Sequence, residues 1–121
     1  MSNIDIRNNL YAVKRHIHEI AVRSGRMPDE ITLVAVSKTR SLAEVKMAID
    51  AGQIDFGENT VQDALSKIPE LKGTRSQWHF IGHLLSKKAK QIPGNFHWVH
   101  SVDSLKLAQK LSNAMLNAEE A

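Results

Sequence analysis

The chain has 121 residues, of which 42% are hydrophobic and 24% are charged, and its formal net charge is +3. These values are ordinary for a globular domain with its own core, and they permit anionic partners without requiring them. The sequence contains no cysteine, which excludes disulfides, thiolate metal sites and cysteine nucleophiles. It also lacks an apolar run long enough for a membrane span or a signal core, so we predict a cytoplasmic protein without a membrane partner.

The first predicted element is a helix over residues 3–25. Its apolar residues recur at spacings of three and four, which places them on one helical face. They are Ile6, Leu10, Val13, Ile17 and Ile20. Gly25 and Pro28 end this helix, and we expect its apolar face to pack against the rest of the domain.

Residues 31–121 repeat a strand–loop–helix pattern four times. The predicted strands cover residues 31–38, 54–58, 77–83 and 96–101, and helices follow from Ser41, Asn59, Leu84 and Ser104. Ser41 and Glu44 have the spacing of a capping box, and Asn59 and Gln62 repeat that spacing. The last helix is expected to bury one face, formed by Leu105, Ala108, Leu111 and Met115. Alternating strands and helices predict an α/β fold with a parallel sheet, either a small open sheet or half of a (β/α)8 barrel.

The strand over residues 31–38 delivers a single lysine to its carboxyl end. Thr32, Val34, Val36 and Lys38 share one face of this apolar strand, which we expect to be buried on both faces. A desolvated lysine loses its proton readily, and the neutral amine attacks carbonyl groups. Lys38 is therefore a candidate Schiff-base lysine. Taken alone, the segment is explained more simply by a strand-end lysine that reaches solvent.

Ligands of parallel α/β folds bind at the carboxyl ends of the strands. Lys38, Asn59, His83 and Ser101 all lie at such ends in the predicted pattern, which favours a site there. Each has a simpler interpretation beside the binding one. Asn59 could cap its helix, His83 could bond a backbone carbonyl, and Ser101 could be structural.

Four segments resemble the pyridoxal phosphate homeostasis protein family, which is related to the barrel domain of alanine racemase. The segments are Leu33–Thr39 (LVAVSKT), Asp55–Asn59 (DFGEN), Trp78–Leu84 (WHFIGHL) and His100–Ser104 (HSVDS). They occur in the family's order and spacing. The chain departs from the family pattern at Leu85 and Lys87, where two polar amides are usual, and at Thr60, where tyrosine is common.

The resemblance implies a (β/α)8 TIM-type barrel, of which residues 1–121 form the amino-terminal half as a single partial domain. It implies that Lys38 holds pyridoxal 5′-phosphate (PLP) as a Schiff base, with Asn59 and His83 beside the cofactor and Ser101 a weaker candidate at the rim. It also implies a role in PLP homeostasis without established turnover, with PLP-dependent apoenzymes as possible recipients. The family's phosphate-binding segments would lie in the missing carboxyl-terminal half.

Half a barrel would leave two strand edges and an apolar inner face uncovered. The chain could be a fragment, a truncated gene product or a half that self-associates to complete the barrel, and we favour the fragment. A continuation of the reading frame that contains a Gly-Met-Ser segment would support that interpretation.

Three other functions are weaker alternatives. His79 and His83 share a predicted strand face, but His97 and His100 point to opposite faces and no acidic cluster completes a set, so we predict no metal site. The run Lys87-Lys88-Ala89-Lys90 is better explained by a solvated helix face than by nucleic-acid binding, because no aromatic residue is interleaved with it. A racemase-like PLP enzyme stays open, although His83 is the only candidate for a second base.

Overall fold

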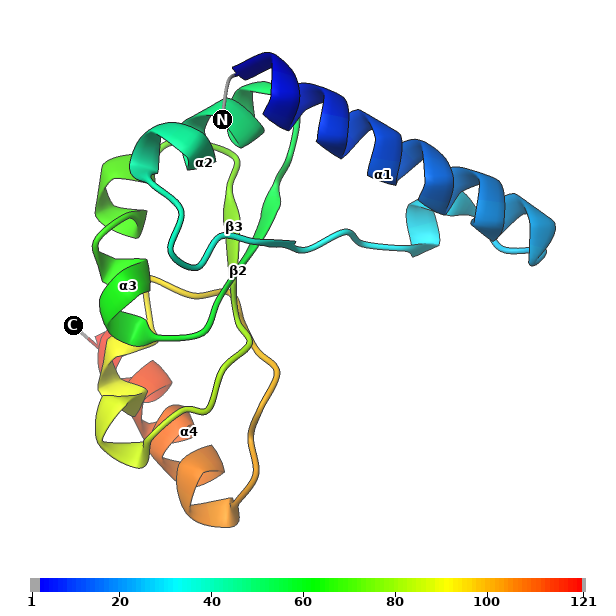
Figure 1. Cartoon of the computed structure of the whole chain (residues 1–121). Helices are drawn as coiled ribbons and strands as arrows, with labels where there is room; N and C mark the ends of the chain where they lie inside the picture. Colours follow the sequence, from blue (N-terminus) through cyan, green and yellow to red (C-terminus); the bar gives the residue numbers. More distant parts are fainter. Residues whose placement is uncertain (1–2, 121) are drawn as a thin grey trace.

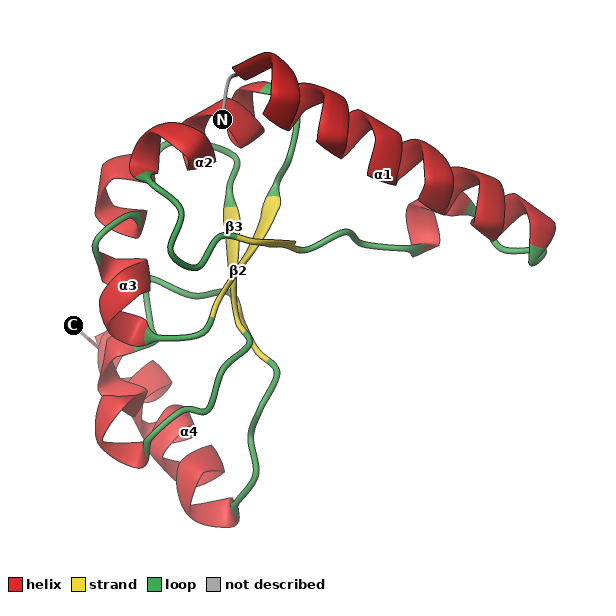
Figure 2. Cartoon of the chain, viewed as in Figure 1, coloured by secondary structure: helices red, strands yellow, loops and turns green. Residues whose placement is uncertain are grey.

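A computed structural model describes residues 3–120 as a curved, four-stranded parallel sheet with helices along one side (Figures 1 and 2). The α-helices are α1 (Asn3–Arg23), α2 (Leu42–Asp50), α3 (Val61–Leu65) and α4 (Leu105–Glu120). The strands are β1 (Ala35–Val36), β2 (Asp55–Glu58), β3 (Gln77–Phe80) and β4 (Trp98–Val99). Three short 3-10 helices complete the order: η1 (Pro28–Glu30), η2 (Ile68–Leu71) and η3 (Ser86–Gln91).

The strands lie in the order β1-β2-β3-β4, and every neighbouring pair is parallel. This is the arrangement of the first half of a (β/α)8 barrel, and the predicted α/β fold is confirmed. Phe56, Trp78 and Phe80 project from β2 and β3 into the core beneath the helices, where each is at most 2% exposed. We call this the outer face of the sheet and the opposite side the inner face.

The inner face is identified by Gly57, Val34 and Ile81. A Cβ atom added to Gly57 would lie 2.9 Å from Ile81 Cδ1 and 3.1 Å from Val34 Cγ1, so these three residues meet on the same side. This face is open in the described part of the chain: Val36 is 51% exposed and Trp98 is 56% exposed. The prediction that the first strand is buried on both faces was therefore wrong for its inner face.

The structure confirms a helix at each of the first two predicted positions. α1 ends at Arg23, and Gly25 follows with a φ of 75°. α2 begins with the predicted capping box, because Ser41 Oγ accepts from the Glu44 backbone N–H at 3.1 Å and the Ser41 backbone N–H donates to Glu44 Oε1 at 3.1 Å. Contrary to the predicted stripe, Val13 and Ile20 are both 46% exposed, because α1 extends away from the sheet (Figure 1).

The structure differs from the prediction in several elements, and β3 (Gln77–Phe80) and β4 (Trp98–Val99) are shorter than the predicted strands. Only Ala35–Val36 forms a strand within residues 31–38. Just before it, the Leu33 carbonyl accepts from Gln53 Nε2 at 2.7 Å instead of from a neighbouring strand. The segment after β3 is a 3-10 helix rather than an α-helix. In α4, Leu107 is the buried residue at 1% exposure, whereas Leu105 is 75% exposed. Ser104 caps this helix by accepting from the Leu107 backbone N–H at 3.1 Å.

Candidate functional site

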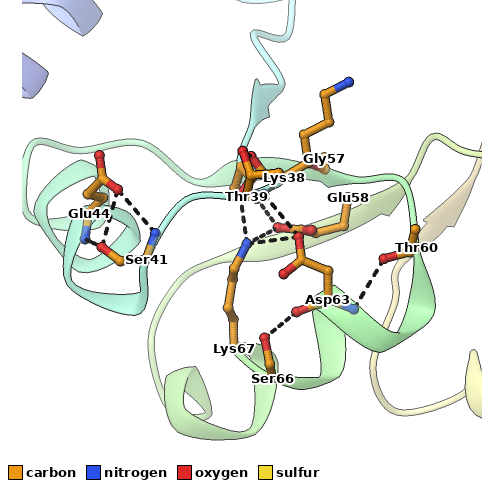
Figure 3. Close-up of polar contacts among 11 residues, drawn as sticks. Lys38, Thr39, Ser41, Glu44, Gly57, Glu58, Thr60, Asp63, Ser66 and Lys67 are labelled. Carbon is orange, nitrogen blue, oxygen red and sulfur yellow. Dashed lines mark hydrogen bonds and ion pairs between the residues drawn. The ribbon is translucent and has the colours of Figure 1, made fainter.

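A buried ion pair between Lys67 and Glu58 lies on the outer face of the sheet, at the carboxyl ends of β1 and β2 (Figure 3). Lys67 Nζ contacts Glu58 Oε2 at 2.9 Å and donates to the backbone carbonyl of Ser37 at 2.6 Å. Ser37 Oγ donates to the same Glu58 oxygen at 2.5 Å. Glu58 is 0% exposed, and Lys67 and Ser37 are each 3% exposed. These three residues hold the end of β1 against β2 from the helix side.

Thr39, the residue that follows Lys38, is held by the same network. Asp63 Oδ2 accepts from the Thr39 backbone N–H at 3.1 Å and lies 3.4 Å from Lys67 Nζ. Thr39 has a φ of 62°, in the left-handed region that a β-branched residue rarely adopts. Because Ser37 and Thr39 are both fixed, the backbone of Lys38 is fixed between them.

The side chain of Lys38 points away from this network (Figure 3). Lys38 is exposed, and its amine has no hydrogen-bond or ion-pair partner among residues 3–120. The sequence thus places two lysines near the end of β1 in opposite situations. Lys67 is buried and paired, whereas the amine of Lys38 is exposed and unpaired among the described residues. The desolvation considered for Lys38 in the sequence is therefore not seen in this part of the chain.

The two carboxylates of the network have pKa values that shift in opposite directions. Burial raises the pKa of Glu58, although its hydrogen bonds from Lys67 and Ser37 act against this. Its second oxygen, Oε1, is buried without a hydrogen-bond partner among the described residues. The backbone N–H of Thr39 lowers the pKa of Asp63 by bonding its charged form, and the nearby Lys67 lowers it further.

Asn59 and Ser101 lie in the loops after their strands, and Gly82 joins these loops. A Cβ atom on Gly82 would lie 2.1 Å from the Asn59 carbonyl oxygen, so only glycine permits this approach of the two backbones. Ser101 Oγ donates to the Gly82 carbonyl. The loops after β2, β3 and β4 are therefore held together. Asn59 is not the cap of α3, contrary to one prediction, because Thr60 Oγ1 accepts from the Asp63 backbone N–H at 3.2 Å.

His83 lies outside this arrangement. β3 ends at Phe80, so His83 is on a loop rather than on the predicted strand. Its side chain is 70% exposed, and its Nδ1 lies 3.7 Å from Asp103 Oδ2. Its predicted contact with a cofactor stays a prediction, as do those of Asn59 and Ser101.

Sequence reasoning missed a hydrogen-bonded chain on the inner face. His79 Nε2 lies 2.8 Å from Asp55 Oδ1, and His79 Nδ1 lies 2.9 Å from His100 Nε2. His79 is 5% exposed and its ring stacks on Trp98, with ring centroids 5.8 Å apart. The alternation of side chains along β2 and β3 puts Asp55 and His79 on the inner face, and this was the available signal.

Within residues 3–120, no group of three or more histidine, aspartate or glutamate side chains is placed to hold a metal ion. The described helices include none with the length and apolar character of a membrane span. A hollow of about 310 Å³ lies between α1, α2 and β1, and none of the four predicted site residues lines it.

Comparison with known proteins supports the resemblance found in the sequence. No family model matches the chain. The pyridoxal phosphate homeostasis protein of Escherichia coli K12 is 46% identical over 112 residues, covering 90% of this chain and 48% of that protein. The protein of the same name from Pseudomonas aeruginosa is 49% identical over 107 residues, covering 88% and 46%. The chain therefore spans about half the length of the curated relatives it matches.

Solved structures give the same result. PipY of Synechococcus elongatus PCC7942, determined with PLP bound, has a TM-score of 0.72 and 38% identity, covering 85% of this chain and 49% of PipY. A structure described as that of an unknown protein from Bifidobacterium adolescentis has a TM-score of 0.84 and 27% identity, covering 97% of this chain and 52% of its own. Both matches cover about half of the solved chain.

Proposed function

We propose that this chain, which corresponds to the amino-terminal half of the pyridoxal phosphate homeostasis proteins, binds PLP as a Schiff base on Lys38 and serves to hold the cofactor. In this proposal the protein acts in the cytoplasm as a carrier that passes PLP to apoenzymes, without turnover of its own. PLP, when bound, supplies an aldehyde that condenses with an amine and a ring that acts as an electron sink.

The observation that carries the proposal is the contrast between Lys38 and its surroundings. The network of Lys67, Glu58 and Asp63 fixes the residues on both sides of Lys38, and the amine of Lys38 itself is unpaired. An amine held on a rigid backbone loses less entropy on binding than one on a mobile loop. The chemistry of this group therefore fits an aldehyde ligand.

The neighbouring loops support the same assignment. Asn59 lies directly after β2, and its backbone passes close to that of Gly82, near the end of β1. We assign Asn59 to the side of the cofactor, and His83 and Ser101 to the rim. In barrels of this class the phosphate is usually bound after strands seven and eight, so we assign the phosphate contacts to segments beyond these four strands.

The test is covalent trapping. We expect exposure to PLP followed by borohydride reduction to fix one pyridoxyl group, and peptide mapping to locate it on Lys38. Lys38→Ala should abolish both the adduct and the visible absorbance of the Schiff base. Lys46→Ala, which removes an exposed lysine of α2, is the matched control and should retain both. Labelling spread over several exposed lysines would contradict the proposal.

The open inner face leads to a second part of the proposal. Trp98 and Val36 lie on this face and are more than half exposed, which is unusual for large apolar residues of a barrel wall. We propose that further strands cover them, either from a carboxyl-terminal half or from a second copy of the chain. Analytical ultracentrifugation separates the two: a stable dimer supports self-association, and a monomer supports a requirement for further strands.

The racemase-like alternative is tested on the same material. Racemisation or transamination of amino acids that depends on Lys38 would establish an enzyme, whereas an adduct on Lys38 without turnover supports the carrier.

A further inference from the structure

The groove between η3 and α4 concentrates positive charge away from Lys38. It has a volume of about 570 Å³, and the two elements that form it pack against each other (Figure 1). Two lysines from each element line it: Lys87 and Lys90 from η3, and Lys106 and Lys110 from α4. All four are exposed. None of the residues around Lys38 lines this groove, so it is a separate feature of the molecule.

The spacing of the lysines explains why they converge. A 3-10 helix has three residues per turn, so Lys87 and Lys90 project from the same side of η3. Residues four apart share a face of an α-helix, so Lys106 and Lys110 project from the same side of α4. Each pair spans about 6 Å along its element. The groove therefore presents two short facing rows of ammonium groups, which the run of lysines in the sequence revealed only in part.

These charges are not neutralised within the described part of the chain. No acidic residue lines the groove, and none of the four lysines forms an ion pair there. Three exposed arginines elsewhere in the chain do have acidic partners four residues away: Arg15 with Glu19, Arg26 with Glu30, and Arg40 with Glu44. The formal net charge of the chain is +3, so residues other than these four lysines sum to −1. The four lysines therefore outweigh the net charge of the whole chain.

The arrangement is unfavourable for α4 without a ligand. Like charges four residues apart destabilise a helix. Lys106 is also in the first turn of α4, where the helix dipole favours negative rather than positive charge. An anion in the groove would relieve both effects.

We propose that this groove binds a compact polyphosphate anion, of the kind found in inorganic tripolyphosphate or in the phosphate chain of a nucleoside triphosphate. Four ammonium groups match the charge of a triphosphate, and rows of about 6 Å match its short length rather than an extended strand. No aromatic side chain and no arginine lines the groove. The groove therefore offers no platform for stacking bases, which recognition of single-stranded nucleic acid normally uses.

The experiment is isothermal titration calorimetry of the full chain with sodium tripolyphosphate at low ionic strength. Two variants remove one row each: Lys87→Gln with Lys90→Gln, and Lys106→Gln with Lys110→Gln. The matched control is Lys46→Gln with Arg75→Gln, which removes two exposed cations outside the groove. We expect one binding site in the wild type, about tenfold weaker binding in either groove variant, and less than a twofold change in the control. Circular dichroism verifies that each variant is folded.

Several results would overturn the proposal. The wild-type chain could fail to bind tripolyphosphate, or the control could lose as much affinity as the groove variants, which would indicate diffuse surface charge. An eight-residue oligothymidylate could bind more tightly than tripolyphosphate and lose that binding in the groove variants, which would identify an extended nucleic acid as the ligand. Because the titration contains no PLP, its result is independent of the proposal for Lys38.

Discussion

The buried ion pair between Lys67 and Glu58 gives the sharpest test of how the site is built. Lys67→Met keeps most of the side-chain volume and removes the ammonium group that bonds Glu58, Asp63 and the Ser37 carbonyl. Removing one partner of a buried pair costs about 3–5 kcal/mol, because the remaining charge is left without compensation. A domain of this size has a free energy of unfolding of about 5–15 kcal/mol, so the variant should lose a large part of it.

The loss should depend on pH in a defined direction. In the wild type Lys67 opposes the rise in the pKa of Glu58 that burial causes, so removing Lys67 should raise that pKa further. A carboxyl with a raised pKa stays protonated in the folded state when it is already ionised in the unfolded state. The folded state then binds more protons, and stability falls as the pH rises from about 4.5 through the raised value. Lys67→Met should therefore be less destabilised at pH 5 than at pH 8.

The measurement is urea denaturation followed by circular dichroism at both pH values. Lys46→Met, at an exposed position of α2, is the matched control and should change the free energy of unfolding by less than about 0.5 kcal/mol. Combining Lys67→Met with Glu58→Met should recover most of the loss, because apolar residues often replace a buried ion pair at little cost. A Lys67→Met variant that behaves like the control at both pH values, or a second substitution that recovers nothing, would contradict a stabilising role of the ion pair.

Three further predictions concern other parts of the site. Gly82→Ala should lower the free energy of unfolding by about 1–3 kcal/mol, because its Cβ would meet the Asn59 carbonyl at 2.1 Å. Gly82 does not have a positive φ, so the loss measured by thermal unfolding reports the clash, and an unchanged stability would contradict the close approach. Asp55→Ala should cost about 1–3 kcal/mol by leaving His79 without its carboxylate partner, whereas Asp55→Asn should cost less; an equal loss in both would argue against the hydrogen bond. The pKa of Asp63 in the folded state lies below its ordinary value of 3.8. The ionised Asp63 therefore stabilises the fold above pH 3.8, and this stabilisation is lost as the pH falls through the lowered pKa. Asp63→Asn should show a smaller decrease in the free energy of unfolding, measured in urea, between pH 5 and pH 2.5 than the wild type does.

The order of the elements could be predicted from the sequence because local signals and the fold agree. The Ser41–Glu44 capping box begins α2, and Gly25 follows the end of α1. The sheet order then follows from the alternation of strands and helices, since consecutive parallel strands are usually neighbours. Lys38 could be placed just after a strand because an apolar run directly precedes it in the sequence.

Other features depend on contacts that no local pattern encodes. Asn59 has the right spacing to cap α3, but Thr60 does so, and the backbone of Asn59 lies beside Gly82. Leu105 fits an apolar stripe as well as Leu107 does, and only the position of α4 beside η3 determines which is buried. The pairing of Asp55 with His79 joins residues 24 apart and follows from the register of β2 and β3.

The two lysines near the end of β1 show why burial, rather than proximity, decides which amine can react. Lys67 Nζ lies 2.6 Å from the carbonyl oxygen of Ser37. Ser37 directly precedes Lys38, so both lysines belong to the same end of β1. An amine that donates to Glu58 and Ser37 while 3% exposed has neither the free electron pair nor the access that an aldehyde requires. The trapping experiment should therefore leave Lys67 unmodified while Lys38 is labelled. Labelling of Lys67 in the folded chain would mean that the ion pair opens readily, and the frame proposed to hold Lys38 would then not be rigid.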